Sequence, residues 1–126
     1  MNTQGEIEAA ICQAMGRFVQ ECMGRGPKDV HAHLIGDLLV VRMQGTLTPA
    51  EQQRVGTLPH EKGRDLLKQV RTLLMEAARP TLEPIVQGIT GAQIRSLHHD
   101  ISTMTGEEIV VFTLDAAPAF REKRPR

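Results

Sequence analysis

Four side chains that could bind a metal ion or move a proton lie in two extended segments. They are His31, His33, His98 and Asp100. Side chains two residues apart leave the same face of a β-strand, so each pair shares a face. If the two strands were adjacent with these faces together, the side chains would converge as ligands for zinc or a non-haem metal. No C-x-x-C or H-E-x-x-H motif accompanies them, and surface or partly hydrogen-bonded histidines are the competing interpretation.

A second chemistry is open to His98 and Asp100. A hydrogen bond from the imidazole to the carboxylate would fix the tautomer and favour the charged ring. On a helix-free sheet face such a pair would be a recognition or pH-responsive site. Beneath packed helices it would be a buried polar pair that contributes stability. The sequence leaves both alternatives open.

Two further residues are candidates for ligand or partner binding. Arg25 lies in a Gly-Arg-Gly-Pro segment whose backbone N–H groups could hold an anion, although such loops normally precede a helix and this one follows a helical pattern. Helix termination is therefore the alternative. Thr105 lies in a polar turn, where its hydroxyl could equally satisfy backbone N–H groups. We predict no catalytic residue and no cofactor.

The amino-acid composition disfavours two classes of partner, nucleic acids and the membrane interior. The 126 residues include 15 basic and 15 acidic side chains and only three aromatic ones, all phenylalanine. Without a net positive charge or stacking platforms, nucleic-acid binding is disfavoured. No apolar run approaches the roughly 20 residues of a membrane span, and no signal peptide precedes the first helical pattern, so we expect a cytoplasmic protein that does not insert into a membrane. Two cysteines about 15 Å apart on one helix cannot bridge, which favours reduced thiols.

Hydrophobic periodicity predicts the elements that position these residues. Apolar residues recur at steps of three and four over residues 4–23 and 60–78, and the second pattern resumes after Arg79-Pro80 and ends at Gly91. On the longer helix the apolar side is formed by Leu66, Leu67, Val70, Leu73, Leu74 and Ala77. A capping signal at Thr48 predicts a short helix from that residue. Extended patterns cover residues 28–35, 38–47, 94–101 and 108–114.

These elements predict an α+β fold. Two α-β-β units would form a mainly antiparallel four-stranded sheet with helices packed on one face. Residues 1–117 would form a single domain, and residues 118–126 a flexible basic tail. The units are similar enough to suggest an internal duplication, but α-β-β is also a common unit. A bare face or open edge on such a sheet is often covered by a second copy, so we expect a homodimer.

Several motifs in order resemble the MpsC-like family of small bacterial proteins. The resemblance spans about residues 4–115 and rests on the segments Gly24–Pro27, Gly45–Glu51, Ala78–Pro80, Ser96–Ser102, Thr105–Glu107 and Val110–Phe112. The family motifs correspond here to Arg25, Gly26, Pro27, Thr48, Glu51, Arg79, His98, Asp100, Thr105 and Gly106. The family name implies association with a sodium-translocating, membrane-potential-generating system.

The resemblance and the lack of a catalytic motif favour a non-enzymatic accessory or regulatory protein. It would act through protein contacts and could join a membrane transport complex. The alternative is a small-molecule or metal-binding protein, or an enzyme, that uses the histidine and aspartate cluster on the sheet.

Overall fold

The computed structural model describes residues 2–24, 26–46 and 60–121, and within them it confirms the α+β class. In chain order the elements are α1 (Gln4–Met23), β1 (Asp29–Ile35), β2 (Leu38–Gln44), α3 (His60–Ala77), α4 (Arg79–Thr90), β3 (Ile94–Ile101) and β4 (Glu108–Leu114). The strands form one antiparallel sheet in the order β1-β2-β4-β3. The predicted short helix from Thr48 lies outside the described residues.

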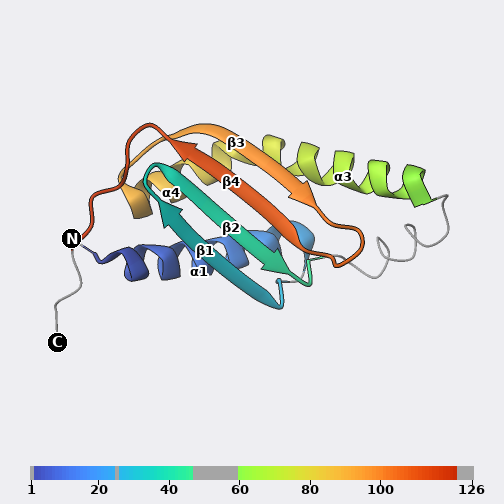
Figure 1. The fold of residues 1–126 in the computed structure, drawn as a ribbon, viewed down its shortest axis with the longest axis horizontal. Coiled ribbons are helices and arrows are strands. Elements are labelled where there is room, and N and C mark those ends of the chain that lie inside the picture. Colours follow the sequence, from blue (N-terminus) through green and yellow to red (C-terminus); the bar gives the residue numbers. More distant parts are fainter. Residues whose placement is uncertain (1, 25, 47–59, 122–126) are drawn as a thin grey trace.

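The two α-β-β units meet in the middle of the sheet. β1 and β2 form one hairpin, β3 and β4 form the other, and β2 pairs with β4. The helices cover one face of the sheet, and Figure 1 shows the opposite face uncovered. α1 lies along the first hairpin, whereas α3 lies along β3 and extends past the β3–β4 turn. β1 and β3 are consequently the two outer strands.

Local sequence explains where α1 begins and ends. Thr3 accepts a hydrogen bond from the backbone N–H of Glu6, and the Glu6 carboxylate accepts one from the backbone N–H of Thr3. This reciprocal pair satisfies N–H groups that the first turn leaves without helical partners. The helix ends at Gly24 in the left-handed conformation, with φ of 79°, which glycine adopts without steric cost.

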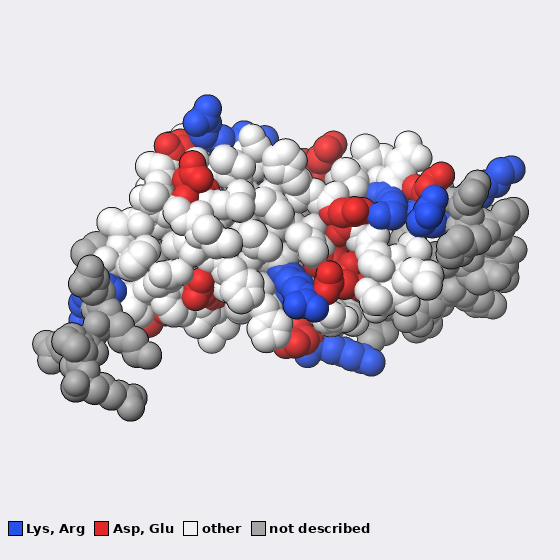
Figure 2. Space-filling view, in the orientation of Figure 1, with Lys and Arg blue, Asp and Glu red and all other residues white. Residues whose placement is uncertain are grey.

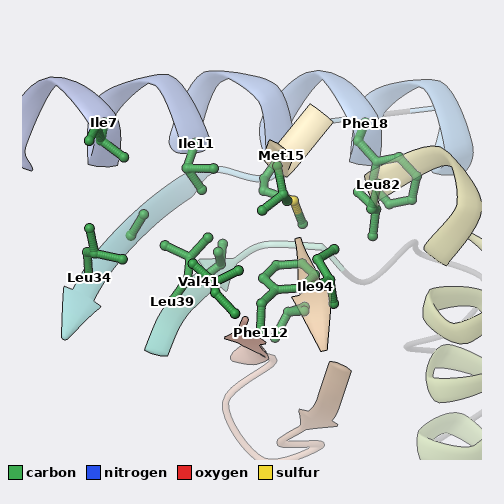
Figure 3. Close-up of a cluster of buried hydrophobic side chains, with 14 of the residues drawn as sticks. Ile7, Ile11, Met15, Phe18, Leu34, Leu39, Val41, Leu82, Ile94 and Phe112 are labelled. Carbon is green, nitrogen blue, oxygen red and sulfur yellow. The ribbon is translucent and has the colours of Figure 1, made fainter. Parts of the chain in front are cut away.

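The main core lies between the sheet and the helices. Leu39 and Val41 of β2 and Phe112 and Leu114 of β4 are completely buried on the helix-covered face. Figure 3 shows side chains of α1 and Leu82 of α4 pointing toward these strands. Burying a side chain of this size contributes about 1.5–3 kcal/mol to stability, so this layer fixes which sheet face receives the helices.

The junction of α3 and α4 follows the sequence prediction. α3 ends at Ala77, and α4 begins at Arg79 with Pro80 in its first turn. Proline fits there because it lacks the backbone N–H that an interior helical residue would donate. Arg79 also donates from Nη2 to the carbonyl oxygens of Ile94 and Arg95, both at 3.1 Å. These hydrogen bonds hold the helical junction beside the start of β3.

After β4 the chain returns to the start of α1. The backbone N–H of Arg121 donates to the carbonyl oxygen of Asn2 at 2.7 Å, and Nη2 of Arg121 lies 3.7 Å from Oε1 of Glu6. The described chain thus brings residue 121 against the N-terminal cap. None of the helices in the described part has the length and apolar character that a membrane crossing requires.

Candidate functional site

The four predicted metal-ligand candidates all lie on the helix-free face, but on opposite edges of the sheet. His31 and Asp100 are the ends of one cross-strand row, in which Arg42 and Ile109 lie between them. Three strand spacings of about 4.8 Å separate the ends by roughly 14 Å. His33 and His98 end the next row in the same way. The condition that β1 and β3 be adjacent is therefore not met within one copy of the chain.

Each pair finds other neighbours instead. Nε2 of His31 lies 2.9 Å from Oδ2 of Asp29 on the same strand. Oδ1 of Asp100 accepts a hydrogen bond from Nζ of Lys68 at 2.6 Å and another from the backbone N–H of Ile101 at 2.8 Å. Among the described residues, no three His, Cys, Asp or Glu side chains are close enough together to hold a metal ion.

The environment of Asp100 favours its ionised form. The hydrogen bond from Lys68 lowers the pKa of this carboxyl, and the Ile101 N–H and the charge on Lys68 lower it further, while partial desolvation opposes them. Asp100 and Lys68 border a shallow depression of about 260 Å³, which Arg64 and Glu107 also line. With two cationic and two anionic side chains, this depression has no sign preference for a ligand.

The two remaining candidates differ in what the structure says of them. Arg25 lies outside the described residues. The hydroxyl of Thr105 accepts a hydrogen bond from the backbone N–H of Glu107 at 3.2 Å, and its own backbone N–H donates to Oγ of Ser102 at 3.3 Å. These bonds stabilise the β3–β4 turn, as expected of threonine and serine in turns.

A buried polar cluster beneath α3 was not predicted from the sequence. Nε2 of His99 lies 2.5 Å from Oε2 of Glu108, and Oγ1 of Thr72 lies 2.9 Å from Nδ1 of the same ring. Nη1 of Arg71 lies 3.5 Å from Oε1 of Glu108, and its Nη2 donates to the carbonyl oxygen of Thr46 at 2.7 Å. Because Nε2 of His99 and Oε2 of Glu108 face each other at this distance, one of the two atoms carries a proton in the contact.

The sequence did contain a signal for this cluster. Glu108 has the same strand parity as Val110 and Phe112, and His99 has that of Ile101, so alternation places both on the core face. Arg71 lies four residues from both Leu67 and Met75, which are buried on α3. Polar residues at core positions of three elements predict a buried network.

Next to this cluster is a small, mainly apolar cavity. It has a volume of about 40 Å³ and is lined by Phe18, Val19, Cys22, Met23, Arg71, Leu74, Met75 and Glu108. The volume is far below the roughly 300–1,000 Å³ of typical small-molecule pockets. The buried ion pair thus adjoins a packing gap between α1 and α3.

Most of the exposed large hydrophobic side chains in the described residues lie together in an apolar stripe on α3. The α3 stripe consists of Leu66, Val70, Leu73 and Leu74, which are 43–56% exposed. Their spacing of three and four places them next to one another along the helix. Leu66, Val70 and Leu73 are turned away from the buried row of Leu67, Arg71 and Met75, whereas Leu74 borders that row and also lines the cavity beside it. Contiguous large apolar side chains on a helix surface are typical of a protein contact.

The helix-free sheet face is a second, less exposed apolar surface. Its centre is formed by the half-buried side chains Leu38, Val40, Ile109 and Val111. Figure 2 shows this face with an uncharged area over the strands and with charged side chains gathered toward the β3–β4 turn. One ion pair there joins Nε of Arg42 to Oε2 of Glu107 at 2.6 Å.

Comparisons with known proteins agree with the sequence resemblance. Residues 3–116 match the family described as "Na+-translocating membrane potential-generating system (MpsC)". The chain is 34% identical over 112 residues to the uncharacterized protein YbcI of Bacillus subtilis (strain 168), which covers 89% of this chain and 88% of the relative. No solved structure gives a significant match.

Proposed function

Because the chain belongs to the MpsC family, we propose that it is a non-enzymatic accessory protein of a cation-translocating membrane system, acting through protein contacts as a homodimer on the cytoplasmic side. The family description supplies the membrane system. The exposed α3 stripe supports action through protein contacts.

The observation that carries this proposal is the exposure of the α3 stripe. Leu73 is 56% exposed and Leu66 is 46% exposed, although the same helix buries Arg71 at 3%. Exposed leucines and a buried arginine are both unfavourable for a single chain. If α3 were turned about its axis so that the leucines faced the core, the fold would gain stability. A partner surface over the stripe accounts for that arrangement, because it covers the leucines in the assembled state.

The experiment is to measure sodium-dependent membrane potential in vesicles from cells of the source organism that lack this protein. A potential-sensitive dye reports the response to added Na⁺. We expect a reduced response in the deletion strain and recovery when the full chain is supplied. Mass spectrometry of the tagged protein, cross-linked in those cells, should recover a membrane subunit of the same system.

Two results would count against the proposal. An unchanged sodium response in the deletion strain removes the link to cation translocation. Recovery of the response by soluble extract without this chain removes the accessory role. A matched strain that expresses a Leu39→Asp variant, whose completely buried position is disrupted, controls for effects of expression alone.

A further inference from the structure

We infer that a second copy of this chain covers the α3 stripe, with the two α3 helices antiparallel about a two-fold axis close to Gln69. This inference rests on the homodimer of the proposed function and names the surface that forms it. It does not depend on the membrane system, because the purified chain alone is sufficient to test it.

The charge pattern beside the α3 stripe supports this pairing. Lys62, Gln69 and Glu76 are exposed and recur at intervals of seven residues, so they follow one side of the helix next to the stripe. A two-fold axis at Gln69 relates positions seven residues before it to positions seven residues after it. Lys62 of one copy then faces the partner's Glu76, and the same contact forms a second time by symmetry.

A parallel pair would not have this complementarity. In a parallel arrangement Lys62 would face Lys62 of the second copy, and Glu76 would face Glu76, which is repulsive at both ends. Neither side chain has an ion-pair partner within the described part of the chain. Both are therefore available for contacts between copies.

The apolar residues fit the same axis. With Gln69 at the centre, Leu66 of one copy packs beside the partner's Val70, and the reverse contact follows by symmetry. α3 has 18 residues and thus offers a contact about 27 Å long and about 10 Å wide. This is smaller than the roughly 800 Å² per partner of a standard interface, so we expect a weak dimer that dissociates on dilution.

Charge reversal tests the pairing by equilibrium sedimentation of the full chain at low ionic strength. Lys62→Glu and Glu76→Lys should each weaken dimerisation about tenfold, because each replaces two attractive contacts with two repulsive ones. The double variant Lys62→Glu/Glu76→Lys should return to within about threefold of the wild type. The differences should shrink at high salt. Both substituted positions are exposed, and circular dichroism checks that the variants fold.

Cysteine cross-linking tests the orientation. In a Cys22→Ser background, Gln69→Cys should form a disulfide-linked dimer, since the two copies of residue 69 meet at the axis. Lys62→Cys should not, because its two copies are about 21 Å apart along the helices. Equally fast cross-linking of both variants would establish a parallel pair and overturn the inference.

A control on the other apolar surface completes the test. Both variants are measured at a protein concentration ten times the wild-type dissociation constant. Val40→Asp on the helix-free sheet face should leave the dimer intact, whereas Leu73→Asp should abolish it. A monomeric wild type at 100 µM, charge reversals without effect, a double variant that fails to recover, or loss of the dimer only in Val40→Asp would each refute the α3 pairing. A dimer that passes these tests in a protein with no effect on membrane potential would refute only the proposed membrane role.

Discussion

The imidazole of His99 and the carboxylate of Glu108 form a contact of 2.5 Å between two side chains with 0% and 2% exposure. Because the strands carrying them are paired, with His99 opposite Val110 and Ile101 opposite Glu108, the contact is a diagonal across the sheet. α3 covers it from above and adds Arg71 to the same carboxylate. Three elements are thereby joined through one acidic group.

Replacing Glu108 with Gln should destabilise the protein strongly. The change leaves Arg71 buried without the opposite charge at Glu108, and losing one member of a buried pair costs about 3–5 kcal/mol. Urea unfolding followed by circular dichroism measures the loss. Glu107→Gln is the matched control, since its partner Arg42 is 53% exposed and such surface pairs contribute at most about 1 kcal/mol. Equal losses in the two variants would show that the buried charge has no special weight.

Two glycines at the end of α4 should respond oppositely to alanine. Gly91 has φ of 75°, where a Cβ costs about 1–2 kcal/mol, so Gly91→Ala should lower the melting temperature. Gly88 lies inside the helix, and a Cβ added there meets nothing within 4 Å. Gly88→Ala should therefore raise the melting temperature by stabilising the helix by up to about 1 kcal/mol. Differential scanning calorimetry distinguishes the two signs.

The lowered pKa of Asp100 predicts an acid-dependent contribution to stability. Because the folded pKa lies below the unfolded value of about 3.9, the contribution is fully present above about pH 5 and is lost as pH falls through the folded pKa. Carbon-detected NMR titration should show the Asp100 pKa rising in Lys68→Met, because the main cause of the shift has been removed. An unchanged titration would mean that the Lys68 contact does not persist in solution.

The two free cysteines should differ in reactivity. Burial raises the pKa of the Cys12 thiol, although a backbone hydrogen bond with Ala32 partly opposes this effect. At a given pH a smaller fraction of Cys12 is therefore in the reactive thiolate form than for a cysteine of ordinary pKa. Cys22, in contrast, is exposed to solvent. With a disulfide reagent at pH 8, the Cys12→Ser variant should react quickly and the Cys22→Ser variant at least about tenfold more slowly. Similar rates would show that Cys12 is accessible.

The sequence predicted the elements of the fold where local signals were complete. The Thr3–Glu6 capping box and Gly24 define both ends of α1, and the predicted bounds of β3 and β4 agree with the structure. β4 is a run of β-branched and other apolar residues, and the polar turn between the two strands marks where β3 ends and β4 begins. Helical periodicity and the two hairpins predicted the two α-β-β units, and the tendency of elements to pack in layers predicted helices on one face.

The arrangement of the candidate site could not be predicted, because it depends on strand order. The sequence fixes which side chains share a strand face but not which strands are neighbours. β1 and β3 are outer strands, so His31 and His98 cannot share a ligand within one copy. Periodicity likewise identified the apolar side of α3 without showing that Leu73 stays exposed while Arg71 is buried.

The last prediction follows from the side of α3 that faces the core. Met75 is 6% exposed and packs in the core, whereas Leu73 is 56% exposed on the α3 stripe. At submicromolar concentration, where the chain is monomeric, Met75→Ala should cost about 2–5 kcal/mol and Leu73→Ala less than about 1 kcal/mol. At 100 µM the Leu73→Ala variant should fall further behind the wild type, because dimerisation stabilises the wild-type fold by mass action. Chemical unfolding at both concentrations measures these differences. If Leu73→Ala is as destabilising as Met75→Ala in the dilute sample, the stripe is buried in the single chain and the rotation of α3 described above is wrong.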